Sequence, residues 1–484
     1  MKLRWLRQIK LRREIGFPIL AGFSVGILAV FTQGLPSKWA GAVVLSMLIP
    51  IIILSVKDFK KIILIAIVVN MPLAFDVTIL NHVDHQGGPP GYVISLMTLA
   101  LIAGYIIWLV ERPRVPVYHF TPMTSSLLVF IFVSIASIFQ SIDIILSLSN
   151  VFLLLQVFLM YFYVINHVKS WTDFRLILDV WMVCLALEGL LMIFQHFTGS
   201  RFDFAGIGTQ SFQDTTASVD AIRVGGTIGS PNGAAIWLTP SLAITMGAYL
   251  IYSELKLPEA GLALISILVG MAGLVFTFSR SGWFAIGLAV LILGALALKK
   301  GVGKKALLAL SITGLLGFSL FYNMIAQRLG KDDAGSVKSR LLGEEMAYKM
   351  IEANPFGVGI NNFNERRMDY LPAELVGLPA KNVFIVHNHY LLIIAETGLY
   401  GLLSLLWILL AIAAQGMRWL NNRMDMRVYI VSASVLAALA GYALHMASDI
   451  FAGPMQVQLL WFMGALITAA SHLTEAPWPS SAAK

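Results

Sequence analysis

A cluster of polar side chains opens one of the most apolar stretches of this sequence. His387, Asn388 and His389 directly precede the run YLLIIAETGLYGLLSLLWILL, which also contains Glu396. A neutral imidazole can accept a proton near neutral pH, because its ordinary pKa is about 6.5. We therefore expect His387 to act as a general base, with Asn388, His389 and Glu396 in supporting roles. His387 could instead only cap the helix or bind a lipid headgroup.

Three arginines could bind anions. Arg280, in FTFSRSGWF, lies in a connection of a few residues between two apolar runs, so its guanidinium group must lie at or near the membrane interface. Arg223, in AIRVGGTIGSPNGAAIW, precedes another apolar run, and Arg340 opens the stretch SRLLGEEMAYKMIEANPFG. Guanidinium groups bind phosphate oxygens in bidentate fashion, so these arginines favour a lipid substrate that carries phosphate. They could also serve only as anchors to lipid headgroups.

Metal and nucleotide chemistry have less support in the sequence. It contains no Walker A loop, no HExxH motif and no Asp-x-Asp motif. His82, Asp84 and His85 share the loop NHVDHQGGPPG, but three such residues without a fourth ligand are more typical of a solvated loop. Cys184 is the only cysteine, which excludes an internal disulfide and a zinc-thiolate site. We expect no metal ion and no cofactor.

The composition identifies the scaffold that must position these residues. Of the 484 residues 58% are hydrophobic and only 12% are charged, and the mean hydropathy is +0.80. A water-soluble domain could not cover so much apolar surface, whereas a membrane-spanning helix needs about 20 such residues. The sequence predicts an all-α polytopic membrane protein, with residues 1–484 forming a single transmembrane domain. Fourteen spans are predicted, at 16–32, 39–56, 61–75, 92–110, 122–140, 144–165, 174–197, 232–252, 261–277, 283–298, 305–322, 390–414, 428–447 and 455–471.

The distribution of basic residues predicts the orientation. The N-terminal MKLRWLRQIKLRRE is typical of the cytoplasmic flank of an uncleaved first helix. With this end inside, the cytoplasmic segments hold 22 of the 34 Lys and Arg residues, as the positive-inside rule requires. Both termini are then cytoplasmic, and the candidate site is extracytoplasmic. The net charge of +8 reflects this orientation rather than a nucleic-acid partner, since no nucleic-acid motif accompanies it.

One extracytoplasmic segment, residues 323–389 between the eleventh and twelfth spans, is too long for a passive connector. Within it, Leu342, Met346 and Met350 fall on one face of a predicted helix that should end before Pro355. This amphipathic helix could lie at the membrane surface, or it could form a lid over a site that faces outwards.

Several of these segments resemble the O-antigen ligase and O-antigen polymerase superfamily. In HNHYLLIIAETGLYG, the spacing of the His-Asn pair, Gly398 and Gly401 is similar to the signature of that family. TIGSPNGAA with Asn232, FSRSGW, and SRLLGEEMAYKMIEANPFGVGINNF resemble its other recurrent segments, in the same order. The resemblance covers roughly residues 223–410.

The resemblance implies a GT-C-like membrane glycosyltransferase of the bacterial cytoplasmic membrane. Such an enzyme takes a glycan from a polyprenyl pyrophosphate carrier at the outer leaflet, without a metal ion or a nucleotide sugar. Arg223 and Arg280 would bind the pyrophosphate, and His387 would lie beside the hydroxyl of a glycan or glycolipid acceptor. A polymerase joins lipid-linked repeat units, and a chain-length regulator protein could be its partner, whereas a ligase moves the finished chain onto lipid A-core. The chain length and the fourteen spans favour a polymerase.

A flippase or transporter of lipid-linked glycans is the alternative from a different class. Fourteen helices suit such a carrier, and Glu188 and Asp179 place ionisable groups in the seventh span. However, the two halves of the sequence are dissimilar, and hydrogen bonds between helices would explain both carboxylates equally well.

Overall fold

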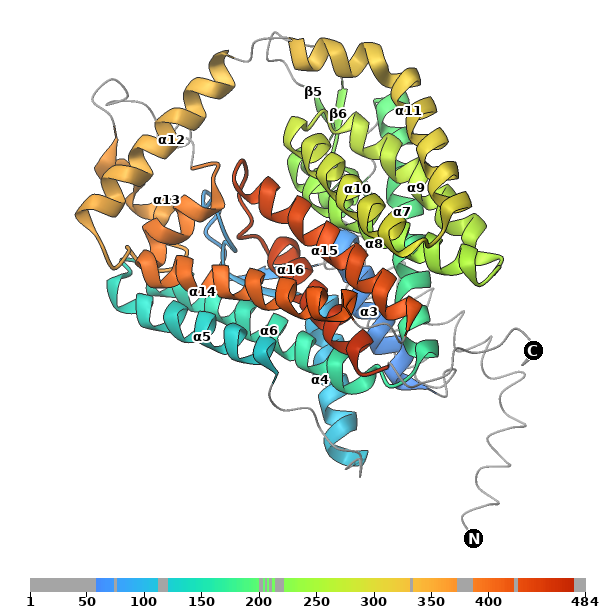
Figure 1. The fold of residues 1–484 in the computed structure, drawn as a ribbon. Helices are drawn as coiled ribbons and strands as arrows, with labels where there is room; N and C mark the ends of the chain where they lie inside the picture. The colour runs from blue at the N-terminus through green and yellow to red at the C-terminus, as the bar shows by residue number, and fades with distance from the viewer. Residues whose placement is uncertain are drawn as a thin grey trace, which may run out of the picture.

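The computed structural model describes most of the chain after residue 57. The described residues are 58–73, 76–111, 121–199, 203–204, 207–208, 211–213, 222–330, 334–371, 386–421 and 425–473. The spans predicted at 16–32 and 39–56 lie outside them. Figure 1 shows that the described chain is a bundle of helices, with α12 and α13 over one end of α14.

Helices dominate because backbone N–H and C=O groups in a lipid environment must be satisfied within the chain. Eight of the described helices are long and apolar enough to cross a membrane, so this is a polytopic membrane protein. Its longer helices are α3 (Phe59–Leu73), α4 (Leu96–Glu111), α5 (Pro122–Ser137), α6 (Ile144–His167), α7 (Trp171–Thr198), α8 (Pro231–Glu254), α9 (Glu259–Phe276), α10 (Arg280–Lys300), α11 (Lys304–Gly330), α12 (Ala334–Ala353), α14 (His389–Leu420), α15 (Met426–Met446) and α16 (Pro454–Ser471).

Every predicted span that falls on described residues coincides with a helix, but three boundaries were wrong by four residues or more. The twelfth span was predicted to end at residue 414, whereas α14 continues to Leu420. The span predicted from residue 92 begins with strand β2 (Tyr92–Ser95), which pairs antiparallel with β1 (Asp76–Ile79). Tyr, Val and Ile favour extended backbone, which explains why the helix starts only after them. The eleventh span continues past residue 322 to Gly330, because NMIAQRL consists largely of helix formers and a glycine ends it.

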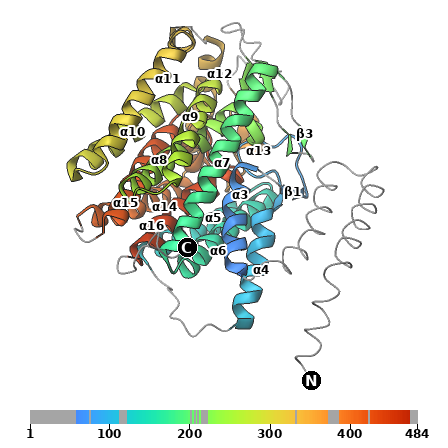
Figure 2. The same cartoon turned by 90° about the vertical axis from the view of Figure 1, so that its right-hand side faces the viewer.

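The central helix of the bundle is α8. Ser230 caps its N-terminus by accepting a hydrogen bond from Gly233 N, and Pro231 occupies the first turn, where its missing N–H costs nothing. Figure 2 shows α8 among α7, α9, α10 and α15. A Cβ atom on Gly247 would lie 2.5 Å from Ser434 Cβ, so the small residues let α8 and α15 approach closely.

The amphipathic helix predicted in the long segment is present as α12, and it ends at Ala353 as predicted. Met346, Ala347 and Met350 are buried, while Lys349 is exposed. The buried face packs on α14 and on the short helix η3 (Arg367–Tyr370), which follows α13 (Phe363–Arg366). This helix therefore rests on the protein itself.

An interruption in α14 ties it to the same segment. Gly398 adopts φ 66° and ψ −170°, so the helical hydrogen-bonding pattern breaks there. The carbonyl oxygens of Ala395 and Glu396 accept instead from Val358 N at 3.0 Å and Gly359 N at 2.8 Å. The PFGVG stretch thus supplies the donors that the broken helix lacks, as buried backbone groups require.

This junction leaves no room for a side chain at Gly357. Its φ is 84°, and a Cβ atom would lie 2.4 Å from the carbonyl carbon and oxygen of Glu396. We expect Gly357→Ala to destabilise the protein by at least about 1–2 kcal/mol, because it adds left-handed strain to a backbone clash. Thermal unfolding of the purified protein in detergent measures this. Gly261→Ala is the control, since no atom lies within 4 Å of its Cβ position, and equal stability of the two variants would contradict the junction.

Candidate active site

His387 lies just before α14 and faces a carboxylate from another part of the chain. Its Nδ1 is 3.4 Å from Oδ1 of Asp449, on the connection between α15 and α16. The side chain of His387 is 25% exposed, whereas that of Asp449 is 7% exposed. The pair therefore combines a buried carboxylate with an imidazole that a substrate could reach.

Asp449 is held in its charged form. Burial alone would raise its pKa, but the hydrogen bond and charge of His387, the charge of His445 and the N–H of Ile450 together bring the pKa below its ordinary value. Asp449 is consequently ionised at neutral pH. A carboxylate on Nδ1 orients the ring and stabilises the protonated imidazole, which leaves Nε2 to take a proton from a substrate.

His445 connects this pair to the start of α10. Its Nε2 is 3.0 Å from Oγ of Ser281, the residue that follows Arg280. The charges of both Asp449 and Arg340 act on His445, which places Arg340 near the same cluster. The structure thus brings three of the predicted residues, His387, Arg280 and Arg340, to one end of the bundle.

Arg223 is joined to the connection that precedes Arg280. It lies on β6 (Ile222–Val224), which pairs with β5 (Ser211–Gln213). Its Nε donates to the carbonyl oxygen of Thr277 at 2.9 Å, and its Nη2 donates to Oδ1 of Asn232 at 2.8 Å. Asn232 is therefore a positioning residue for Arg223, whose guanidinium group binds the α9–α10 connection three residues before Arg280.

A further arginine, Arg328 on α11, binds the same connection. Its Nε donates to the carbonyl oxygen of Phe278 at 3.4 Å. Phe278 is buried and has φ 52°, a backbone conformation that is strained for a residue with a side chain. We infer that the arginines help to hold this tight turn, which sets the direction of Arg280. Sequence reasoning missed Arg328 because the long segment contains several basic residues. Its position at the end of an apolar helix is the one signal that could have distinguished it.

The helix cap at α14 is Asn388, not His387. Oδ1 of Asn388 accepts from Tyr390 N at 3.1 Å and from Leu391 N at 3.2 Å. Two backbone donors at this end are thereby satisfied by Asn388, so the ring of His387 does not serve as the cap and is available for Asp449.

His389 and Glu396 have different partners. His389 is buried, and its Nδ1 accepts from Phe451 N at 3.4 Å. Oε1 of the buried Glu396 accepts from Phe363 N at 3.1 Å, so this carboxylate binds the long segment rather than His387. Both residues support the loops around the site.

The histidines of the early loop bind protein groups. His82 Nδ1 lies 3.4 Å from Asp143 Oδ2, and His85 Nε2 lies 2.8 Å from Asn361 Oδ1. Over the described residues, no group of three or more His, Cys, Asp or Glu side chains is placed to hold a metal ion. Asp84 lies in a turn between His82 and His85 in the sequence.

The two carboxylates that motivated the transporter alternative also have protein partners. Glu188 accepts from Thr227 N at 2.7 Å and from Thr227 Oγ1 at 2.8 Å. Asp179 accepts from the hydroxyl of Tyr252 at 2.8 Å. Both therefore make the interhelical or helix-to-loop hydrogen bonds that favour a structural role.

The helices and this cluster define a multi-pass membrane protein with an arginine- and histidine-containing site at one end. Residues 263–406 match the family described as O-antigen ligase. The matched part of the chain is therefore similar to a domain of the O-antigen ligase and polymerase family, whose members transfer glycans in polysaccharide assembly. The match includes Arg280, Arg340 and His387, whereas Arg223 and Asp449 lie outside it. No curated protein matches the chain.

Proposed function

We propose that this protein is a GT-C-like glycosyltransferase that moves a glycan from a polyprenyl pyrophosphate carrier to a sugar hydroxyl at the outer leaflet. The observation that carries the proposal is the His387–Asp449 pair, 3.4 Å apart, at the same end of the bundle as Arg280. A base beside arginines suits a reaction in which a hydroxyl attacks and a pyrophosphate leaves.

In the proposed reaction, Nε2 of His387 takes the proton of the acceptor hydroxyl. The oxygen of this acceptor hydroxyl attacks the anomeric carbon of the donor, and the bond between that carbon and the pyrophosphate oxygen breaks. The bonding electrons leave with the lipid pyrophosphate, whose negative charge Arg223, Arg280 and Arg340 neutralise. Asp449 holds the resulting imidazolium until its proton is released.

The reaction is tested by incubating purified protein with a labelled lipid-pyrophosphate glycan. Glycosyl transfer yields a new glycosidic bond and free lipid pyrophosphate, which chromatography detects. A flippase would move the lipid without making such a bond, so its product would be unchanged donor.

We favour the polymerase over the ligase because of the length of the chain and its predicted number of spans. Glycan analysis of a deletion strain separates the two. Loss of all long polymer indicates a polymerase, whereas polymer that accumulates on the carrier lipid indicates a ligase.

The proposed reaction requires α12 to face the extracytoplasmic side. We expect a reporter enzyme fused near Leu342 to lie on the extracytoplasmic side, because the positive-inside distribution predicts that location for residues 323–389. An alkaline phosphatase fusion measures this, with a fusion after residue 484 as the cytoplasmic control. Cytoplasmic location of Leu342 would overturn the orientation.

A further inference from the structure

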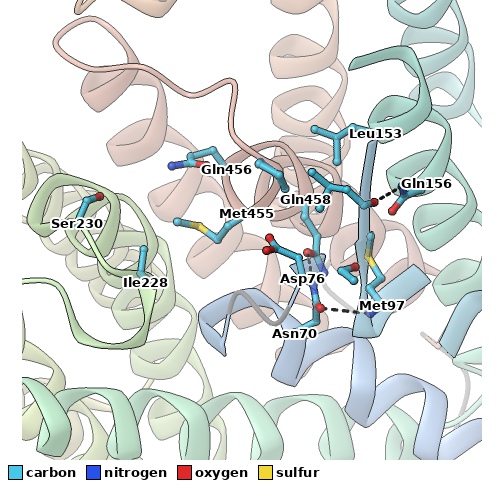
Figure 3. Close-up of a pocket in the computed structure, with 13 residues that line it drawn as sticks. Asn70, Asp76, Met97, Leu153, Gln156, Ile228, Ser230, Met455, Gln456 and Gln458 are labelled. Carbon is cyan, nitrogen blue, oxygen red and sulfur yellow. Dashed lines mark hydrogen bonds between the residues drawn. The ribbon is translucent and has the colours of Figure 1, made fainter. Parts of the chain in front are cut away.

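A cavity lined by both polar and apolar groups lies where the starts of α8 and α16 approach α3, β2 and α6 (Figure 3). Its volume is about 180 Å³. A cavity needs only about 10–15 Å³ by this measure to hold one water, so this one has room for a much larger group, such as one sugar ring. Figure 3 shows Asp76 beside Asn70 and Gln458, with Ser230 on the side opposite Gln156.

Hydrogen bonds hold the amides of this cavity in fixed orientations. Asn70 Nδ2 donates to Gln458 Oε1 at 3.1 Å, and Asn70 Oδ1 accepts from Met97 N at 3.2 Å. Gln458 Nε2 donates to the carbonyl oxygen of Ile67 at 3.1 Å. A primary amide has two N–H groups and two acceptor lone pairs, so these bonds leave each amide capacity for a further partner. Such fixed groups bind a ligand with little loss of side-chain entropy.

The chemistry of the lining residues selects the class of ligand. The lining contains a carboxylate, Asp76, and several amides and hydroxyls, but neither lysine nor arginine, so it does not suit a phosphate. Sugar hydroxyls both donate and accept hydrogen bonds, as amides and carboxylates require. Met97 and Met455 add apolar surface for the C–H groups of a sugar ring. These features together fit a neutral sugar.

The position of the cavity relates it to the proposed reaction. Ser230 caps α8 two residues before Asn232, the partner of Arg223. Gln456 lies near the start of α16, directly after the connection that carries Asp449. The cavity therefore adjoins both the segment that holds a candidate pyrophosphate ligand and the segment that orients the candidate base.

We propose that this cavity is a subsite for one neutral sugar of the glycan being assembled, an assignment that rests on the proposed function. The sugar could belong to the donor or to the acceptor, since both consist of the same hydroxyl-rich units. Binding in the cavity would set the distance between the anomeric carbon and the attacking hydroxyl.

The test uses the full chain in lipid nanodiscs with two variants of nearly unchanged side-chain size, Asp76→Asn and Gln456→Met. The probe is the repeat-unit oligosaccharide, freed from its carrier lipid by mild acid. We expect each variant to bind the oligosaccharide about tenfold more weakly in saturation-transfer NMR, or to raise KM for the lipid-linked donor by a similar factor. In either case kcat should change little. Gln415→Met is the control, because Gln415 bonds Thr468 near the opposite end of α16.

A raised KM for the donor with an unchanged KM for the acceptor assigns the cavity to the donor, and the reverse pattern assigns it to the acceptor. Weaker binding of the free oligosaccharide, which shares its units with both, supports a sugar subsite without assigning it to either. If both variants match Gln415→Met in binding and in KM, the cavity holds only water and the proposal is overturned. This outcome is distinct from failure of the proposed function, in which the unmodified protein would form no glycosidic bond. Thermal unfolding of each variant verifies that it is folded.

Discussion

Replacing His387 by alanine should abolish glycan transfer, with turnover reduced at least a hundredfold, while the affinity for the lipid-linked donor changes little. The expected loss is that of a general base, which contributes about 10²–10⁴-fold to a rate. Donor binding should persist because arginines, not His387, are expected to hold the pyrophosphate. Single-turnover kinetics and equilibrium binding of the lipid-linked donor measure the two effects separately.

Asp449→Asn is the companion variant and should also lower kcat, because it removes the charge that orients and stabilises the imidazole of His387. His472→Ala serves as the control, since His472 follows the opposite end of α16. Wild-type turnover of His387→Ala, or intact turnover with lost donor affinity, would contradict the assignment of His387 as the base.

Arg280→Lys should reduce polymer formation at least tenfold even though the positive charge is retained. Lysine is a point charge on a flexible stem and cannot form the two parallel hydrogen bonds that a guanidinium group makes to phosphate. The strained turn at Phe278 fixes the position of Arg280 at the start of α10. The backbone therefore cannot shift to bring a lysine ammonium group to the place of the guanidinium group. Polymer analysis in cells and membrane fractionation measure activity and insertion.

Arg366→Lys is the matched control for this variant. Arg366 is on α13, and its Nη1 pairs with Asp369 at 3.3 Å, with about a third of its side chain exposed. An ion pair on the surface contributes little, so this substitution should leave polymer formation unchanged. Near-normal polymer from Arg280→Lys would show that Arg280 is only a membrane anchor.

Helices were the most predictable part of the fold. Long apolar runs indicate spans, and the spacing of Met346 and Met350 indicated which face of α12 is buried. The β1–β2 pair and the break at Gly398 were not predicted, for one physical reason. Tyr92–Ser95 and the stretch around Gly398 are both apolar enough to continue a helix, and their pairing with β1 and with the PFGVG stretch shows that they do not.

The candidate site was predictable where local sequence marks it. His387 and Arg280 stand at the ends of apolar runs, and family resemblance singles out the segments around them. Asp449 was missed because it is 62 residues from His387 and lies in ASDIFAGP, which carries no chemical pattern. Arg328 was missed for a similar reason. A pair that forms only when two connections meet cannot be recognised from either one alone.

The hydrogen bonds between the PFGVG stretch and the broken α14 also constrain how the chain assembles during synthesis. Ile360 bonds Ser137 and Ser147, which are 223 and 213 residues earlier, so their helices emerge from the ribosome long before it does. Val358 and Gly359, by contrast, emerge before the carbonyl groups that they bind. Their backbone amides lack these partners until α14 is made, so the junction between the PFGVG stretch and α14 can form only after α14 is inserted. A nascent chain arrested ahead of α14 would present an open loop to quality-control proteases.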